Sequence, residues 1–349
     1  MSIVDVRPTS VRRSWAVVAV GTLLLAALAG VMVGPVDLNP IAVLAEIGNR
    51  LPFIDVGSGF SEQESAILWQ LRMPRVVLGG IVGAMLALAG AAYQGVFRNP
   101  LADPYLLGVA AGAGLGATLA IAYFPAASGW PVDPLPLAAF IGALVGVTAT
   151  YALGRAGSRS RSAATLVLAG VAMASFFTAA QTFVQQRQSE TLRQVYNWIL
   201  GQLTISSWRE VTLVLPYVII SAVVILLHRR LIDVLSVGDE EADSLGVDSR
   251  RVRLLIVIAA SLGTAAAVAV SGLIGFVGII VPHTVRLLMG SSYRLVLPLS
   301  VVFGAAFLIL TDLAARVIVA PAEIPIGVIT AFLGAPFFML VLRRSRRTV

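Results

Sequence analysis

The densest group of residues that could do chemistry is an acidic stretch, GDEEADSLGVDSRRVR, at residues 238–253. Its carboxylates belong to Asp239, Glu240, Glu241, Asp243 and Asp248. Carboxylates are preferred ligands of Mg²⁺, and membrane prenyltransferases hold Mg²⁺-pyrophosphate with aspartate-rich motifs. Those enzymes normally need two such clusters, whereas the chain contains one. The stretch therefore favours a charged contact surface, with a prenyltransferase-type enzyme as the less favoured alternative.

Residues for other chemistries are scarce. The chain contains no cysteine, which excludes disulfides, thiolate metal sites and a cysteine nucleophile. The two histidines, His228 and His283, lie far apart in the sequence, and neither an HExxH nor a GxSxG motif is present. We therefore expect no catalytic residue, no metal site and no cofactor.

The basic residues restrict how the protein could use ATP. All 25 of them are arginine, and the sequence contains no lysine. A P-loop binds phosphate through a lysine, so the chain cannot form a Walker A site. If ATP drives the protein, a separate subunit must hydrolyse it. The net charge of +7 does not indicate nucleic-acid binding, because the arginines lie in short loops between apolar segments.

The elements that carry these residues are membrane helices. The chain is 58% hydrophobic and 12% charged, about half the charged fraction of a soluble protein. About ten apolar segments are predicted, of which two are too short to cross a bilayer unless they pack inside the protein. The segments are 15–34, 66–92, 105–122, 131–154, 162–185, 210–230, 252–272, 276–289, 294–318 and 327–343. We expect an all-α polytopic membrane protein with a single transmembrane domain over residues 1–349.

The distribution of arginine predicts the topology. If the N-terminus is cytoplasmic, the inside segments hold eighteen of the 25 arginines, as expected because basic loops stay inside. An even number of helices places both termini on the same side. We therefore expect a multi-pass protein of the inner membrane with both termini in the cytoplasm. The apolar run after Arg12 and Arg13 is interpreted as a retained first helix rather than a cleaved signal peptide.

Small residues recur at the spacing of helix contacts, which lets two backbones approach closely in lipid. The groups are Gly30/Gly34, Gly79/Gly83, Gly108/Gly112/Gly116 and Gly142/Gly146. In addition, residues 86–108 resemble residues 267–290 at one constant offset. The matched pairs are Gly90/Gly272, Pro100/Pro282 and Gly108/Gly290. In the predicted topology the first copy enters from outside and the second from inside, which indicates an inverted repeat, a common transporter architecture.

Three stretches resemble the permease family that serves iron–siderophore, haem and cobalamin uptake, the type II ABC importers. They are RMPRVVLGGIVGAMLALAGAAYQGVFRNPLADPYLLGVAAGAGLG at 72–116, the acidic stretch at 238–253, and SGLIGFVGIIVPHTVRLL with EIPIGVITAFLGAPFFMLVLRR within 271–344. The resemblance implies a transport subunit rather than an enzyme. It implies ten helices per subunit, a homodimeric pore, two cytoplasmic ATPase subunits and an external binding protein. An iron–siderophore complex is the first expectation for the substrate, with haem and cobalamin close behind.

The resemblance assigns the acidic stretch, about residues 236–252, to the segment that docks on the ATPase. Its two bracketing glycines enclose DEEADSL, which could make two short helical turns with acids at the positive end of the helix dipole. Ala242 and Leu245 are three residues apart and would share one face. The expected coupling residues are Gly238, Asp239, Glu240, Glu241, Ala242, Leu245, Gly246 and Val247. A merely solvated loop is the alternative.

Three arginines, Arg72, Arg75 and Arg316, lie at the predicted outer ends of helices, against the inside bias. Their placement suggests a surface that receives a partner rich in carboxylates. The resemblance implies that arginines at these RxPR and DxxAR positions contact glutamates of the binding protein. The alternative is that they snorkel to lipid headgroups. Asp312 falls inside an apolar segment, where ionisable groups are costly, and we expect it to make a structural hydrogen bond to a neighbouring helix end.

The remaining polar residues are expected to be structural. Gln94, Arg98 and Asn99 lie where a helix breaks at the inner side, and His283 is expected to tie down a short helix. The stretch 190–208 is predicted to be an external re-entrant or interfacial turn, although the resemblance places the nearby region close to the inner gate. The rival function is a secondary transporter driven by an ion gradient. It would need several ionisable groups at mid-membrane, where Asp312 is nearly alone.

Overall fold

The computed structural model describes residues 13–34, 36–50, 57, 59–124, 133–156, 163–204 and 206–345, and this part of the chain folds into helices without strands. Each of the ten predicted membrane segments corresponds to a helix or to one continuous run of helix. They are α1 (Arg13–Met32), α3–η1–α4 (Glu62–Ala66, Ile67–Arg72 and Met73–Val96), α5 (Val109–Tyr123), α6 (Pro134–Ala156), α7 (Ala163–Arg187), α9 (Trp208–Leu227), α12 (Ser249–Ser271), α13 (Val277–Met289), α14 (Tyr293–Val317) and α15 (Ile326–Ser345). Seven of them are long and apolar enough to cross a membrane, while α5, α13 and α15 are shorter apolar helices. The predicted polytopic all-α class is confirmed.

Short helices connect the membrane segments. They are α2 (Pro40–Gly48), η2 (Ser189–Thr191), α8 (Leu192–Ile199), α10 (Arg229–Val237) and α11 (Asp239–Ser244). Local sequence explains several of the helix starts, because side-chain oxygens satisfy N–H groups that have no partner inside the helix. Ser61 and Glu64 form a capping box at the start of α3, and Ser207 and Glu210 form another at the start of α9.

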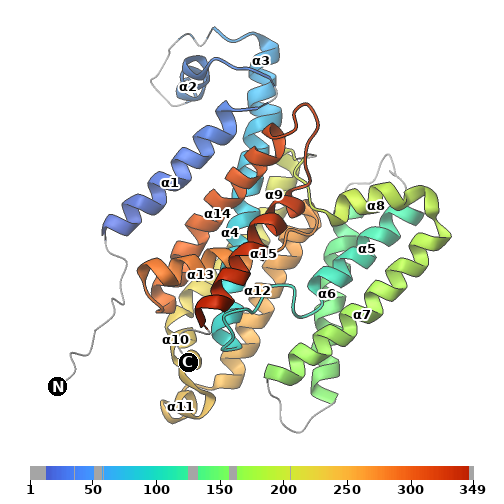
Figure 1. Cartoon of the computed structure of the whole chain (residues 1–349), viewed down its shortest axis with the longest axis vertical. Coiled ribbons are helices and arrows are strands. Elements are labelled where there is room, and N and C mark those ends of the chain that lie inside the picture. Colours follow the sequence, from blue (N-terminus) through green and yellow to red (C-terminus); the bar gives the residue numbers. More distant parts are fainter. Residues whose placement is uncertain are drawn as a thin grey trace.

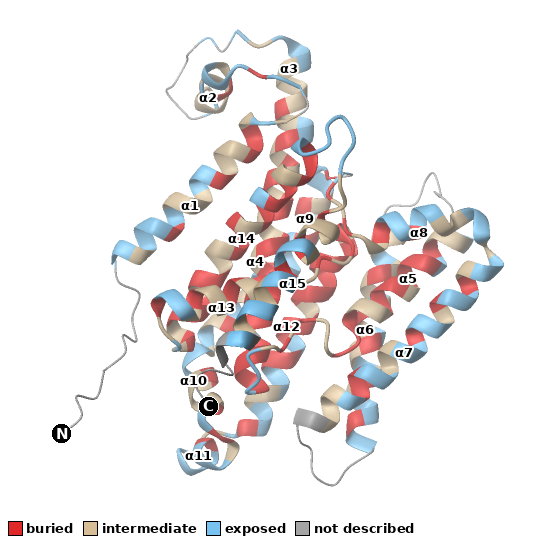
Figure 2. Ribbon diagram, viewed as in Figure 1, coloured by how far each residue is buried: buried red, intermediate tan, exposed pale blue. Residues whose placement is uncertain are grey.

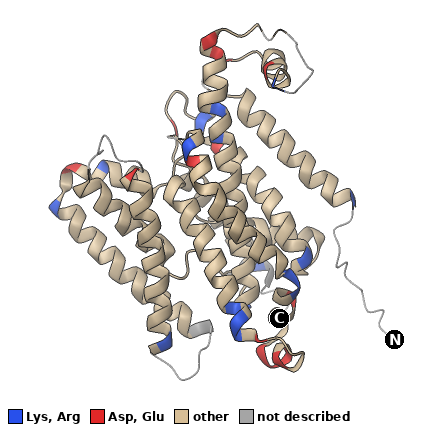
Figure 3. Cartoon of the chain, turned by 180° about the vertical axis from the view of Figure 1, so that it is seen from behind, with Lys and Arg blue, Asp and Glu red and all other residues tan. Residues whose placement is uncertain are grey.

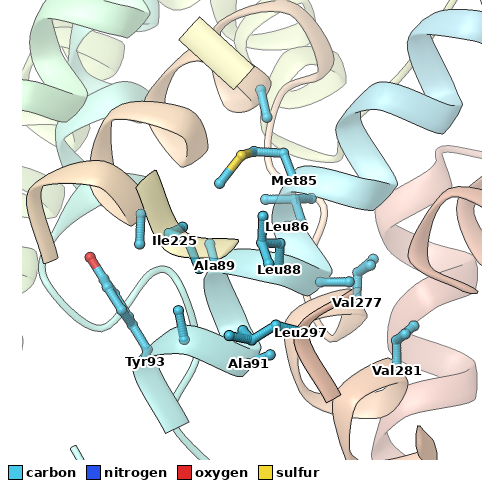
Figure 4. Packing of buried hydrophobic residues seen from close by; sticks show 14 of the residues in the cluster. Met85, Leu86, Leu88, Ala89, Ala91, Tyr93, Ile225, Val277, Val281 and Leu297 are labelled. Carbon is cyan, nitrogen blue, oxygen red and sulfur yellow. The ribbon is translucent and has the colours of Figure 1, made fainter. Parts of the chain in front are cut away.

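Helix α4 occupies the centre of the bundle (Figure 1) and contacts α9, α12, α13 and α14. Its most apolar window is 83% buried, against 22% for the peripheral α1. Figure 2 shows the buried residues concentrated on α4 and on its neighbours. Figure 4 shows Met85, Leu86 and Leu88 of α4 in the same cluster as Val277 and Val281 of α13. A helix that is apolar on every side is expected to be buried, and α4 is the helix that takes this place.

Glycine determines how closely α4 meets its neighbours. A Cβ at Gly83 would collide with the backbone of Gly304 in α14, and one at Gly90 would collide with the backbone of Gly278 in α13. Close backbone contact of this kind is how helices associate tightly in lipid. The predicted use of Gly83 as a packing residue is confirmed.

Helices α5, α6, α7 and α8 form a lobe beside the central bundle, with α12 between the two (Figure 1). The seam between α5 and α6 is built from glycine, since a Cβ at Gly112 would collide with the backbone of Gly142 and one at Gly146 would collide with the backbone of Gly108. The glycine spacings predicted for these two helices therefore mark one shared contact. Gly108 has in addition φ +77°, a conformation that side chains other than glycine rarely adopt.

The inverted repeat is visible in the order of the elements. α4 runs away from the α3 end of the molecule, whereas α12 starts at the α11 end and runs in the opposite direction (Figure 1). A short apolar helix follows each of them. The residue pairs that suggested the repeat are not equivalent, however. Gly90 lies inside α4 while Gly272 ends α12, and Pro100 lies in a turn while Pro282 lies inside α13.

Charged residues gather at the two ends of the helix bundle (Figure 3). α1 starts and α15 ends toward the α11 end, so the described parts of both terminal segments point the same way (Figure 1). The stretch 190–208 forms η2 and α8 and then folds back into the protein. There the Gly201 carbonyl accepts from Ile326 N, and Gln202 N donates to Ser271 O, at 3.1 and 2.9 Å. The predicted re-entrant turn therefore packs on the end of α12.

Candidate functional site

A network of charged side chains joins α4 to α14 near the α3 end of the bundle. The Arg75 guanidinium donates to both oxygens of Asp312 over 2.9–3.1 Å. Asp312 also pairs with Arg316 one turn further along α14, at 3.1 Å. Asp312 is 2% exposed and Arg316 is 3% exposed. The structural role expected for Asp312 agrees with this geometry, but its partners are two arginine side chains rather than a helix end.

Arg72 and Arg316 bind the end of α1. Arg72 Nη1 donates to the carbonyls of Val31 and Met32 at 2.8 and 2.9 Å, and Arg316 Nη2 donates to the Gly30 carbonyl at 3.0 Å. The last carbonyls of a helix lack partners inside it and carry negative partial charge, so arginine is well suited to this position. Both arginines are buried. In this structure, neither guanidinium is available to another protein.

Arg75 differs from the other two arginines because part of it faces outward. Its Nη1 and Nη2 atoms each donate to one oxygen of Glu323 at 2.9 Å. The Glu323 side chain is 29% exposed. Both residues line a polar cavity of about 180 Å³ together with Asn197, Gln202 and Thr204. Sequence reasoning did not identify Glu323. Because Arg75 bonds this partly exposed carboxylate, it is the accessible member of the three arginines.

The segment 238–247 folds into α11 and a turn. The Gly246 N–H bonds the Asp243 carbonyl and the Val247 N–H bonds the Ala242 carbonyl, both at 3.0 Å, while Gly246 has φ +77°. These bonds define a Schellman motif, in which glycine is favoured because of its left-handed conformation. The bracketing glycine thus has a specific geometric role at the end of α11.

Ala242 and Leu245 do not share an exposed face. Ala242 is completely buried in the protein's own core, whereas Leu245 is 71% exposed. Glu240 and Glu241 are exposed beside it. The prediction that Ala242 and Leu245 form one contact face is therefore wrong for Ala242, because α11 turns this residue toward the bundle.

Asp239 connects α11 to two other elements. It pairs with Arg253 of α12 at 2.5 Å and with Arg98, just beyond α4, at 3.7 Å. Arg98 has φ +51°, an uncommon conformation for a residue with a side chain. The first acid of α11 is thus in contact with the ends of both long buried helices.

Polar residues that were predicted at the inner side join neighbouring helices of the bundle. The Gln94 side-chain amide donates to the Gly278 carbonyl at 2.9 Å, and its oxygen accepts from Arg286 of α13. The His283 ring packs edge-on to Phe337 at 5.6 Å, and Nδ1 of His228 lies 2.7 Å from the Val224 carbonyl. Among the described residues no group of histidines and carboxylates could hold a metal ion.

The loop after α4 is tied to the connection between α12 and α13. The Tyr105 hydroxyl donates to the Ile274 carbonyl at 3.1 Å and accepts from Ile274 N at 3.0 Å. Asp103 accepts from Tyr105 N at 2.8 Å. Burial raises the pKa of the Asp103 carboxyl to about 6. The sequence showed these residues only as part of the RNPLADP run.

Two uncharged surfaces are accessible from outside the protein, an apolar cavity beside α15 and a polar face of α7. α15 and the 273–276 connection line an apolar cavity of about 630 Å³, whose lining includes Leu200, Phe276 and Met339. α7 has the lowest mean hydropathy of the seven long helices, 1.6 over its most apolar window. Its exposed polar residues recur every three or four positions and so lie on one face. They are Ser175, Thr178, Thr182 and Gln186.

Known proteins are similar to this chain in sequence and in fold. The FecCD transport family matches residues 22–344. The cobalamin import system permease protein BtuC of Halobacterium salinarum is 43% identical over 285 residues, covering 82% of this chain and 75% of that protein. The hemin transport system permease protein HmuU of Yersinia pestis is 38% identical over 291 residues, covering 80% and 84%. A chain of a transporter assigned to the metal-chelate type of ABC transporters, solved facing inward, superposes with TM-score 0.81 and 27% identity over 95% of this chain and all of that one.

Proposed function

The chain belongs to the FecCD transport family of ABC importer permeases, and we propose that two copies of it enclose the route of a bulky metal chelate or corrinoid. An iron–siderophore complex is the first choice of substrate, with haem and cobalamin next. The relatives named for cobalamin and hemin support this range. The apolar wall of α15, with its cavity of about 630 Å³ and no ionisable lining residue, carries the proposal. Such a wall suits a large ligand held by shape.

The polar face of α7 supports a route between two copies. The Ser175 and Thr182 hydroxyls donate to carbonyls of their own helix, but their acceptor oxygens and the Gln186 amide still gain more from water or a passing ligand than from lipid. Because the chain contains no cysteine, single cysteines can test the arrangement cleanly. We expect Thr178→Cys to form crosslinks between copies with a short bismaleimide, and Ile219→Cys, which is exposed on α9, to form none. Equal crosslinking at both positions would count against α7 as the shared face.

The ion-gradient transporter is disfavoured by the charge network. Asp312 is the acid inside an apolar segment, and in the structure Arg75 and Arg316 neutralise it. A carboxylate whose two oxygens are occupied by arginines is poorly placed to coordinate a transported cation.

Two ATPase subunits are proposed to dock at the α11 end, placed in the cytoplasm by the bias of arginine toward inside loops. The contact surface consists of Leu245, Glu240 and Glu241, since these residues are exposed. Asp239, Ala242 and the Schellman turn hold that surface in place. The Asp239 contacts to Arg98 and Arg253 give the docking event a direct path to the ends of α4 and α12.

An external binding protein is proposed to dock at the α3 end. Of the three outer arginines, Arg75 is the one that a glutamate of the partner can reach, by competing with Glu323. Arg72 and Arg316 contribute by fixing α1 and Asp312 beside it. The alternative, in which the arginines snorkel to headgroups, is less compatible with their bonds to protein carbonyls.

The decisive experiment is uptake in proteoliposomes that contain the chain, its ATPase and its binding protein. We expect ATP-dependent accumulation of one of three radiolabelled substrates: a ferric siderophore, haem or cobalamin. A complete complex that hydrolyses ATP in response to its binding protein but accumulates none of them would overturn the substrate class.

A further inference from the structure

A cavity at the α11 end shares Asp239 and Arg253 with the contacts described above but contains none of the residues of the proposed docking surface. It has a volume of about 260 Å³ and lies between the end of α6, the start of α7, α11 and the start of α12. Its polar lining comprises Arg155, Arg250, Arg253, Asp239, Asp243 and Tyr151. Leucine and valine side chains of α7 and α12 complete the wall.

The two carboxylates in this cavity already have partners. Asp239 pairs with Arg253 Nη2 at 2.5 Å, and Asp243 accepts from Ser249 N at 3.2 Å. The Nε atom of Arg253 is buried and has no hydrogen-bond partner. A buried donor without an acceptor costs free energy, and Arg253 also lines the cavity.

The other two arginines contribute positive charge to the same space. The Arg155 guanidinium lies 5.9 Å from the Tyr151 ring, and Arg250 is exposed at the first turn of α12. Within the described part of the chain, no ion pair joins Arg155 or Arg250 to a carboxylate. The cavity therefore presents two available guanidinium groups.

We propose that this cavity binds the phosphate of an anionic phospholipid. Guanidinium groups bind phosphate oxygens through paired, charge-assisted hydrogen bonds. Basic pockets between membrane helices near the headgroup level are recurrent sites for such lipids. Leu166 and Leu254 line the same cavity and give the acyl chains an apolar surface.

The position of the cavity gives the lipid a mechanical consequence. Arg155 lies at the end of α6 and Arg250 at the start of α12, so a phosphate bound to both would join the two helix ends beside α11, the helix that precedes Leu245. This consequence rests on the proposed ATPase docking, whereas the binding itself does not.

The test uses the purified transporter and two double variants. Arg155→Gln with Arg250→Gln removes both available guanidinium groups and leaves the Asp239–Arg253 pair intact. Arg229→Gln with Arg230→Gln is the matched control, since it removes two exposed arginines of α10 outside the cavity. Each protein is equilibrated with vesicles of phosphatidylglycerol and phosphatidylcholine, and the retained lipid is counted by native mass spectrometry.

We expect wild type and control to retain phosphatidylglycerol in preference to phosphatidylcholine. The cavity variant should lose that preference by about fivefold for each arginine removed. A second arm titrates inorganic phosphate and follows thermal unfolding. Phosphate stabilisation of wild type but not of the cavity variant, without any lipid preference, would assign the site to free phosphate. Equal lipid retention by all three proteins and no phosphate effect would overturn the proposal.

Discussion

Removing the carboxylate of Asp312 should destabilise the protein more than any other single change in the charged network that joins α4 to α14. Asp312 receives the hydrogen bonds of Arg75 and the ion pair of Arg316 while it is 2% exposed. The change Asp312→Asn keeps the volume of the side chain but removes its charge. Arg75 retains Glu323, whereas Arg316, with a side chain 4% exposed, is left without its carboxylate.

The magnitude follows from the state of Arg316. Leaving one partner of a buried pair uncompensated costs about 3–5 kcal/mol. The bonds of Arg316 to the end of α1 remain, so we expect the lower part of this range, about 3 kcal/mol. The matched control is Glu323→Gln, because Glu323 bonds Arg75, the other arginine partner of Asp312, at the exposed edge of the network. An exposed pair is worth about 0–1 kcal/mol.

A double variant separates lost charge from lost contact. Asp312→Leu combined with Arg316→Met removes both members of the buried pair, and replacing such a pair with apolar residues is often neutral. We expect the double variant to recover most of the stability lost in Asp312→Asn. Equilibrium unfolding in mixed micelles, followed by tryptophan fluorescence, measures all four proteins. A double variant that is as unstable as Asp312→Asn, or a single variant no worse than the Glu323→Gln control, would refute the electrostatic account.

Four further outcomes are expected. Glu323→Gln should speed association with an acidic binding protein, more at low salt than at high salt; unchanged rates would remove Arg75 from the docking surface. Leu245→Arg should abolish co-purification with the ATPase while folded yield is kept, whereas Ala242→Arg should lower the yield of the permease itself; the opposite pattern would contradict the placement of α11. Folding raises the pKa of Asp103 from 3.8 to about 6, so the folded chain binds the proton more tightly and stability should rise by about 1 kcal/mol between pH 7 and pH 5; Asp103→Asn should abolish that increment in unfolding measurements. The isolated chain should hydrolyse no ATP, since it has no lysine for a P-loop; turnover by a preparation free of other subunits would disprove this.

The helices could be predicted because most apolar runs are long and end at charged residues, glycine or proline. The centre of the bundle could not be predicted from hydropathy, since α1 and α4 are both strongly apolar and differ mainly in their neighbours. What distinguishes α4 is the placement of Gly83 and Gly90 opposite glycines of α14 and α13. Those contacts join positions far apart in the chain, so the local sequence does not reveal them.

The candidate site was predictable in its residue types and less so in its contacts. Arginines at a predicted outer helix end are unusual, and that rule identified Arg72, Arg75 and Arg316 together. It could not separate the two that bind the last carbonyls of α1 from the one that meets Glu323, because α1 and α14 come together only in the folded bundle. Ala242 was misplaced for a similar reason, since spacing gives the faces of a short helix but not which face the bundle covers.

The central position of α4 has a consequence for biosynthesis. The chain is made from the N-terminus, so α4 enters the membrane before the helices that bury it, and α14 comes near the end of synthesis. Arg75 therefore lacks its buried carboxylate partner until Asp312 has been translated. The α5–α6 seam needs no such delay, because its glycine contacts join neighbours in the sequence. The lobe can thus assemble while the ribosome is still working, and the central bundle closes last.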